Sequence, residues 1–245
     1  MLERDEYRRM ADTETTHWWY AATRALLRQE LGPHLRPDGR FLDAGCGTGA
    51  TGAWMEEHGE VVASDFEPVA LQLYREAHGA AGLAAADVQS LPFADASFDA
   101  VLCVTVLCHR SIPSPAVAVG ELARVLKPGG VLTLWEPGVR RLRRAHDRVT
   151  HSARRFSRLD LAGLCTGNGL EVVRSTGAHS YLVPAAAAKA VVERGRVASD
   201  LDQNPGGLGG VLSRLAAAER FVLRRTALPA GLSVLAIARK PGSPP

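Results

Sequence analysis

A glycine-rich turn is the part of the sequence best suited to hold a ligand close to its backbone. In FLDAGCGTGATG, residues 41–52, Gly45, Gly47 and Gly49 alternate with small residues. Glycine loses more conformational freedom on folding than other residues, so a cluster of glycines indicates a use for bare backbone. Gly45-x-Gly47-x-x-Ala50 also satisfies the dinucleotide-binding fingerprint, and the turn alone therefore leaves the ligand open.

Two aspartates follow this turn at the ends of apolar runs. Asp65 lies 20 residues after Gly45, and Asp87 ends the next run. A carboxylate at the first position can accept hydrogen bonds from a ribose diol. The carboxylate of Asp87 can accept a hydrogen bond from the exocyclic amine of adenine. The backbone N–H of the adjacent Val88 can donate to the adenine ring. Together the turn and the aspartates indicate a nucleoside site.

The elements that must position these residues follow from the alternation of apolar runs and helical patterns. Strands are predicted over 40–44, 60–65, 82–88, 97–104, 131–137, 170–176 and 232–240. Helices are predicted over 3–31, 49–59, 68–79, 117–127 and 158–169, with a helical insertion over 178–231. This order predicts a parallel, doubly wound α/β sheet with helices on both faces. Its ligand is expected at the carboxyl ends of the strands.

The bulk composition narrows the function classes. The chain has 245 residues, 46% of them apolar, and a net charge of +3, which does not favour nucleic-acid binding. Residues 138–158 hold eight arginines and one aspartate. The four cysteines show no metal-site spacing and suit buried thiols in a reducing compartment. No secretory or membrane-spanning segment is evident, so we expect a cytoplasmic protein with neither a bound metal nor a membrane partner.

The ordered motifs DAGCGTG, ASDFEP, ADVQSLPFADASFDAVLC and ELARVLKPGGVLTL resemble those of class I S-adenosylmethionine-dependent methyltransferases. The resemblance runs from about Arg40 to Pro137 and depends on the order and spacing of all four motifs. HWWY (17–20), HDRVTHSARRF and the late ERFVLRRTALPAGLSVLAIARK resemble, less specifically, a bacterial type 11-like subgroup that acts on small or secondary metabolites. The fold implied is Rossmann-like, with seven strands in the order 3-2-1-4-5-7-6 and the last strand antiparallel.

The resemblance implies that S-adenosylmethionine is the cofactor and that the turn holds its amino-acid end. Gly45, Gly47 and Gly49, with Cys46 between them, would border the methionine part of the cofactor. Asp43 would help to hold the turn and the ammonium group of the ligand.

The resemblance also assigns the nucleoside end of the cofactor. Asp65 would bind the ribose hydroxyls, with Phe66 against the adenine. Asp87 and Val88 would fix the adenine edge. Cys103, at the end of the fourth strand, would offer its backbone carbonyl to the ammonium group.

The N-terminal helix carries aromatic and basic residues with two interpretations. Trp18, Trp19 and Tyr20 either form a lid over the cationic sulfonium, which aromatic faces favour, or pin the helix to the core. Arg24, one turn beyond Tyr20, either pairs with the cofactor carboxylate or is solvated.

Three further side chains are candidates for handling the acceptor. A hydroxyl acceptor would usually need a base, and His109 follows the fourth strand on the expected rim. Glu136 ends the fifth strand on the same rim, and His151 lies in the arginine-rich segment. Arg154 and Arg155 either close over an anionic acceptor, for which guanidinium forks are suited, or belong to a solvated connection.

Rival functions are less well supported by the residues. A short-chain oxidoreductase needs a Tyr-x-x-x-Lys pair, and none of the four tyrosines has lysine at that spacing. A nucleic-acid methyltransferase would usually show an NPPY-like stretch or a catalytic cysteine, and CVTVLC after the fourth strand shows neither pattern. A protein methyltransferase and a cofactor-binding protein with a non-methylating, cyclase-like reaction remain alternatives.

The sequence therefore predicts one methyltransferase domain over 1–245. Residues 1–33 form a helical cap, 40–137 the cofactor-binding core, 138–231 the acceptor-side segments and insertion, and 232–240 the last strand. The expected reaction is in-line methyl transfer from S-adenosylmethionine to a small molecule, with a hydroxyl favoured over nitrogen or carbon. We expect a monomer or homodimer of bacterial secondary metabolism, with S-adenosylhomocysteine as the cofactor product.

Overall fold

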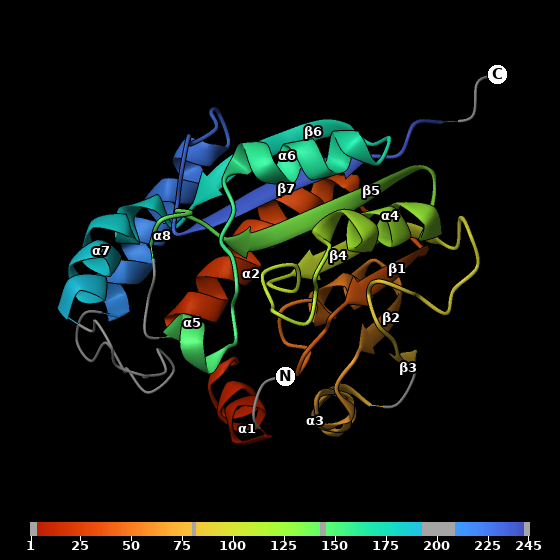
Figure 1. The fold of residues 1–245 in the computed structure, drawn as a ribbon, viewed down its shortest axis with the longest axis horizontal. Coiled ribbons are helices and arrows are strands. Elements are labelled where there is room, and N and C mark those ends of the chain that lie inside the picture. Colours follow the sequence, from red (N-terminus) through yellow and green to blue (C-terminus); the bar gives the residue numbers. More distant parts are fainter. Residues whose placement is uncertain (1–3, 80–81, 143–145, 193–208, 243–245) are drawn as a thin grey trace.

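The computed structural model describes residues 4–79, 82–142, 146–192 and 209–242. A central sheet is covered on both faces by helices (Figure 1). Within the predicted insertion, most of the polar, glycine-rich stretch SDLDQNPGGLGG (199–210) lies outside the described residues.

Seven strands form the sheet in the order β3-β2-β1-β4-β5-β7-β6, which confirms the predicted order. Strands β1 to β5 pair in parallel, and β7 is antiparallel to both β5 and β6. The strands are β1 (Gly39–Ala44), β2 (Gly59–Asp65), β3 (Leu83–Ala85), β4 (Phe98–Val104), β5 (Leu126–Pro137), β6 (Glu171–Ala178) and β7 (Ser233–Arg239). The carboxyl ends of β1 to β6 therefore meet at one edge of the sheet.

The helices divide between the two faces. They are α1 (Arg4–Thr13), α2 (Trp18–Leu31), α3 (Pro68–His78), α4 (Pro115–Val125), α5 (His146–Val149), α6 (Arg158–Gly167), α7 (Val183–Val192) and α8 (Gly209–Leu223). Leu122 of α4 and Leu161 of α6 belong to the core on one face. Leu26 of α2 and Leu223 of α8 belong to the core on the other, around Trp135. The helices named here are therefore held against each face of the sheet by the burial of apolar side chains.

Two predicted helices differ from the structure. The single helix predicted over 3–31 is two, because His17 acts as an N-cap and its side chain accepts a hydrogen bond from the N–H of Trp19. The helix predicted over 49–59 is a short 3₁₀ turn, Ala53–Glu57, because glycines before it delay the helical backbone. The break at His17 frees α1 to lie away from α2, near the start of α3 (Figure 1).

Candidate functional site

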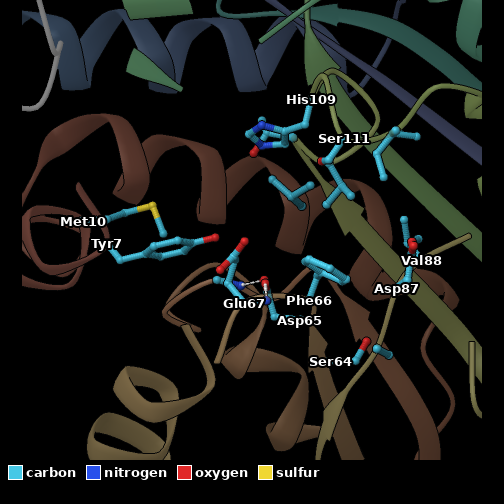
Figure 2. Close-up of a pocket in the computed structure, with 17 residues that line it drawn as sticks. Tyr7, Met10, Ser64, Asp65, Phe66, Glu67, Asp87, Val88, His109 and Ser111 are labelled. Atoms are coloured by element: carbon cyan, nitrogen blue, oxygen red, sulfur yellow. Dashed lines mark hydrogen bonds between the residues drawn. The ribbon is translucent and has the colours of Figure 1, made fainter. Parts of the chain in front are cut away.

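A pocket lies where the carboxyl ends of β1, β2 and β4 meet the loop after β3. Figure 2 shows Tyr7 and Met10 reaching toward it from α1, with Asp65 and Phe66 below, Asp87 and Val88 to one side and His109 above. Its lining residues are Tyr7, Met10, Gly45, Gly47, Ser64, Asp65, Phe66, Glu67, Ala86, Asp87, Val88, Val104, Thr105, Val106, His109, Ser111 and Ile112.

The glycine turn forms one wall of the pocket, in a conformation that side chains rarely adopt. Gly45 has a φ of 75° and Gly47 a φ of 56°. A Cβ on Gly45 would collide with Val106, and one on Gly47 would come within 3.0 Å of Met10. The N–H of Gly45 donates to the carbonyl of Ser64 at 2.7 Å, which ties the turn to the end of β2. Bare backbone is therefore required here by both conformation and space.

Asp65 connects this turn to the floor of the pocket. One carboxylate oxygen accepts the N–H of Gly47 at 2.9 Å, and the other accepts the N–H of Glu67 at 2.9 Å. Burial raises the pKa of Asp65, whereas these two hydrogen bonds lower it. A carboxylate offers about four lone-pair sites, so Asp65 retains capacity for ligand hydroxyls.

The residues predicted for the adenine side also line the pocket. The side chain of Phe66 is 61% exposed, although it is large and apolar, and it lies in the pocket wall. Asp87 accepts the N–H of Gln89 at 2.9 Å, which orients its carboxylate. Phe66 and Asp87 thus offer an aromatic face and a hydrogen-bond acceptor in one pocket.

The pocket is acidic. Asp65, Glu67 and Asp87 line it, and none of the described lining residues is lysine or arginine. Just behind the turn, burial and the nearby charges of Asp65 and Glu14 together raise the pKa of Asp43 to about 7. An anionic pyrophosphate would find no cation in this lining, whereas a cationic ligand would be attracted. The acidic lining therefore fits a nucleoside that carries positive charge.

His109 lies on the rim of the pocket, where the predicted acceptor base should be. Burial lowers its pKa, and hydrogen bonds to the backbone of Thr150 and Thr105 partly offset that effect. Its imidazole is therefore neutral near pH 7, the protonation state that can take up a proton.

Glu136, the other predicted acceptor contact on this rim, does not line the pocket. It is fully buried. Its carboxylate accepts the N–H groups of Val106 at 3.1 Å, Leu107 at 2.8 Å and Cys108 at 3.1 Å. Because Val106 lines the pocket, Glu136 holds the wall in place from behind and makes no contact with the pocket itself.

Other predicted site residues also lie outside the lining. Cys103 is buried, and the next two residues, Val104 and Thr105, reach the pocket in its place. Arg24 donates to the backbone carbonyl of Glu14 at 2.7 Å. Burial and the charges of Glu14 and Glu6 raise the pKa of Tyr20, whereas the charge of Arg24 lowers it. The remaining predicted residues outside the lining are Asp43, Cys46, Gly49 and His151.

The two arginines considered for an anionic acceptor bond within the protein. Arg154 donates to the carbonyl of Ile112 at 2.6 Å. Arg155 forms a buried, two-pronged ion pair with Asp147, at 2.6 and 3.1 Å. Both guanidinium groups are therefore engaged within the protein, which does not match the anion clamp, and the 5% exposed Arg155 does not match a solvated connection either.

Tyr7 and Met10 are pocket residues that sequence reasoning missed. They are spaced one turn apart on α1, whose sequence RDEYRRMADT is otherwise mostly polar. Two larger apolar side chains on one face of a polar helix were the available signal. Burial raises the pKa of Tyr7, and so does the charge of Asp65 across the pocket.

The fold and pocket together define a class of protein. Strands in the order 3-2-1-4-5-7-6 and a glycine turn after β1 are what the resemblance to class I methyltransferases implies. Residues 42–134 match the family model described as "Methyltransferase domain". This part of the chain is therefore similar to methyltransferase domains.

Two bacterial methyltransferases are similar in sequence to part of the chain. The malonyl-[acyl-carrier protein] O-methyltransferase of Erwinia pyrifoliae is 36% identical over 148 residues, covering 57% of this chain and 56% of that protein. The demethylmenaquinone methyltransferase of Deinococcus radiodurans is 39% identical over 104 residues, covering 40% and 42%. The chain thus spans about half the length of the curated relatives that it matches.

A solved structure shares the fold. The phosphoethanolamine N-methyltransferase 2 of Haemonchus contortus, solved in complex with S-adenosyl-L-methionine, aligns with a TM-score of 0.59 at 18% identity. The alignment covers 91% of this chain and 53% of that one. In this chain, no described helix has the length and apolar character needed to cross a membrane. The described residues also contain no group of three or more His, Cys, Asp or Glu placed to hold a metal ion.

Proposed function

We propose that the protein binds S-adenosylmethionine in this pocket and transfers a methyl group to a small molecule. The acidic lining carries the proposal: three carboxylates and no described cation suit a ligand with a sulfonium and an ammonium group, and they disfavour a dinucleotide. When bound, S-adenosylmethionine supplies an activated methyl group. The protein needs mainly to hold and orient the reactants, which can account for about 7–11 kcal/mol of a barrier in the best cases.

The residues present fit this cofactor. Asp65 is proposed to bind the ribose hydroxyls with its remaining lone pairs, and Phe66 to cover the adenine. Asp87 and Val88 are proposed to meet the adenine edge, since both line the same wall. Gly45 and Gly47 leave room for the methionine portion, because side chains at either position would fill that space.

The acceptor is proposed to be a small molecule methylated on oxygen. His109 supports this, because its neutral imidazole on the pocket rim can take the proton that a hydroxyl loses. One of the two relatives is a malonyl-[acyl-carrier protein] O-methyltransferase and the other a demethylmenaquinone methyltransferase, and the first name specifies transfer to oxygen. Methylation on nitrogen or carbon, and a cyclase-like reaction in the same pocket, are the alternatives.

The setting of the reaction is proposed from composition and cysteine chemistry. The four cysteines are buried and unbridged, which suits a reducing compartment such as a bacterial cytoplasm. A role in secondary metabolism, and action as a monomer or homodimer, are part of the same proposal. An anionic acceptor has no support from Arg154 or Arg155, whose guanidinium groups bond within the protein.

Phe66→Ala is the sharpest test of cofactor binding, because the exposed ring can be removed without opening the core. Stacking on an adenine base contributes roughly 1–3 kcal/mol, so calorimetry should show S-adenosylmethionine affinity falling about 5- to 150-fold. Phe221→Ala is the matched control, since that ring is 58% exposed and lies on α8.

Three results would contradict the proposal: equal affinity in wild type and Phe66→Ala, an equal loss in the Phe221→Ala control, or tighter binding of NAD than of S-adenosylmethionine. The cofactor question is thereby answered before any acceptor is known.

A further inference from the structure

His179 is a buried polar residue that the proposed methyl transfer does not use. It follows directly after β6, in a left-handed conformation with a φ of 53°, and is 1% exposed. Neither ring nitrogen has a hydrogen-bond partner among the described residues. Burial lowers the pKa of His179 to about 3, so the ring is neutral. An unbonded polar group of this kind costs about 1–3 kcal/mol, and such costs are typical of functional sites.

A carboxylate from the insertion holds this residue in its strained conformation. Glu219 of α8 accepts the N–H of His179 at 2.7 Å and that of Ser180 at 2.6 Å. Glu219 is itself only 9% exposed. His179 is therefore fixed through its backbone, while its buried ring nitrogens have no hydrogen-bond partner among the described residues.

Aromatic side chains surround the imidazole. The ring of Trp19, on α2, lies 4.1 Å from it between centroids, and that of Trp135, on β5, lies 5.5 Å away. The ring of Tyr181 is 6.2 Å away in an edge-on arrangement. The Tyr181 hydroxyl is also buried and has no partner among the described residues. Two unbonded polar groups thus share an aromatic setting.

This cluster adjoins the cofactor pocket. Trp135 pairs in register with Val104, and the N–H of Thr105 donates to the Trp135 carbonyl at 2.6 Å. Val104 and Thr105 both line the pocket. Because β5 and β6 run in the same direction, His179 stands at the same edge of the sheet as the pocket.

We infer that His179 and Tyr181, walled by Trp19 and Trp135, form a subsite for the acceptor, and that it takes a neutral aromatic alcohol. A phenolic hydroxyl would bond the free imidazole nitrogen and the Tyr181 hydroxyl, while its ring packs edge-on or offset against the tryptophans. The inference deepens the proposed function, and it rests on that function only in naming the bound alcohol as the methyl acceptor. The binding of the alcohol can be measured without any cofactor.

Phenol is the probe, and the full-length protein with ¹⁵N-labelled histidine is the sample, measured with and without S-adenosylhomocysteine. His179→Asn, which tolerates the left-handed backbone, identifies the His179 ring signals by their loss. Phenol is expected to shift these signals in the wild type. Toluene, which keeps the shape but lacks the hydroxyl, should bind at least about 3-fold more weakly, because one hydrogen bond is lost.

Tyr181→Phe provides the second measurement, with Thr133→Val as its matched control. Both substitutions delete a buried hydroxyl that has no partner among the described residues, but Thr133 lies within β5, before its carboxyl end. Tyr181→Phe should weaken phenol binding about 3- to 10-fold with an unchanged or higher Tm, and Thr133→Val should leave phenol affinity unchanged.

The inference is overturned if phenol leaves the His179 signals in place, or if toluene binds as well. Equal phenol affinity in Tyr181→Phe and wild type would overturn it too, because both groups would then be structural. Phenol binding that persists when S-adenosylhomocysteine fails to bind would refute the proposed function but keep the subsite. The two failures are therefore distinguishable.

Discussion

The buried ion pair of Arg155 and Asp147 should stabilise the fold rather than bind the acceptor. The side chains are 5% and 9% exposed. Besides its two bonds to Asp147, the guanidinium of Arg155 donates to the carbonyl of Gly138 at 3.0 Å, just after β5. The pair thus fixes the segment after β5, whose Ala153 N–H in turn donates to the carbonyl of Cys108 at 2.9 Å, beside His109.

Replacing Arg155 by alanine takes the guanidinium away from a carboxylate that stays buried. Breaking a buried pair from one side costs about 3–5 kcal/mol. For a chain of this size, that corresponds to a fall in Tm of roughly 6–20 °C. Arg140→Ala is the control in the same segment: Arg140 is 67% exposed and lies 3.5 Å from Asp160. A surface pair of this kind contributes about 0–1 kcal/mol.

Guanidinium chloride unfolding at pH 7 measures both variants. The double variant Arg155→Met/Asp147→Leu should recover most of the lost free energy of unfolding, because apolar side chains can replace a buried pair at little cost. The reasoning is refuted if Arg155→Ala unfolds at the same denaturant concentration as Arg140→Ala. If in addition the KM for the acceptor rises in Arg155→Ala, the residue acts as the anion clamp that its sequence context suggested.

Three further predictions concern titrating groups. His109→Ala should lower turnover about 100-fold or more, as loss of a general base does, while calorimetry shows unchanged S-adenosylmethionine affinity; unchanged turnover would exclude His109 as the base. His179 has a pKa of about 3 in the fold and about 6.5 unfolded, so its contribution to stability is complete above pH 6.5 and is lost as the pH falls toward 3. Denaturant titrations between pH 7 and 4 should show this slope, up to about 1.4 kcal/mol per pH unit, and His179→Asn should flatten it. Because burial and nearby acids raise the pKa of Asp43 to about 7, a cationic ligand should bind more tightly as the pH rises through 7, and calorimetry on Asp43→Asn should show a flatter profile; a flat profile in the wild type would contradict this.

The sheet and the cofactor wall were predictable because both depend on local pattern. Apolar runs that alternate with helices fix parallel strands, and the residue that ends each strand falls at the ligand edge. Gly45, Gly47 and Asp65 line the pocket for this reason. Asp87 also lines it but lies in the loop after β3, because β3 is Leu83–Ala85 and shorter than the strand predicted over 82–88. The strand end did not identify the lining residue: β4 ends at Val104, as predicted, but Cys103 is buried, and the pocket meets Val104 and Thr105.

The residue that ends a strand does not reveal which segments far away in the sequence will contact it, so such contacts were not predictable. Glu136 does end a strand at the rim, but three backbone N–H groups of the loop after β4 bind its carboxylate and hold it in the core. Tyr7 and Met10 reach the pocket only because the chain breaks between α1 and α2 at the His17 cap. His179 carries no motif, and its setting is made by side chains from α2, β5 and α8.

The charge of the pocket explains why a turn that satisfies the dinucleotide fingerprint can serve another ligand. In dinucleotide sites a glycine turn faces the start of a helix, whose N-terminal dipole attracts phosphate. Here the turn leads into a short 3₁₀ segment, Ala53–Glu57, and is backed by Asp43 and Asp65, whose carboxylates are both buried. Burial of two neighbouring acids without a cation costs free energy, which a positively charged ligand would reduce. The glycines thus allow a ligand to come close to the backbone of the turn, and the surrounding carboxylates favour a ligand with positive charge.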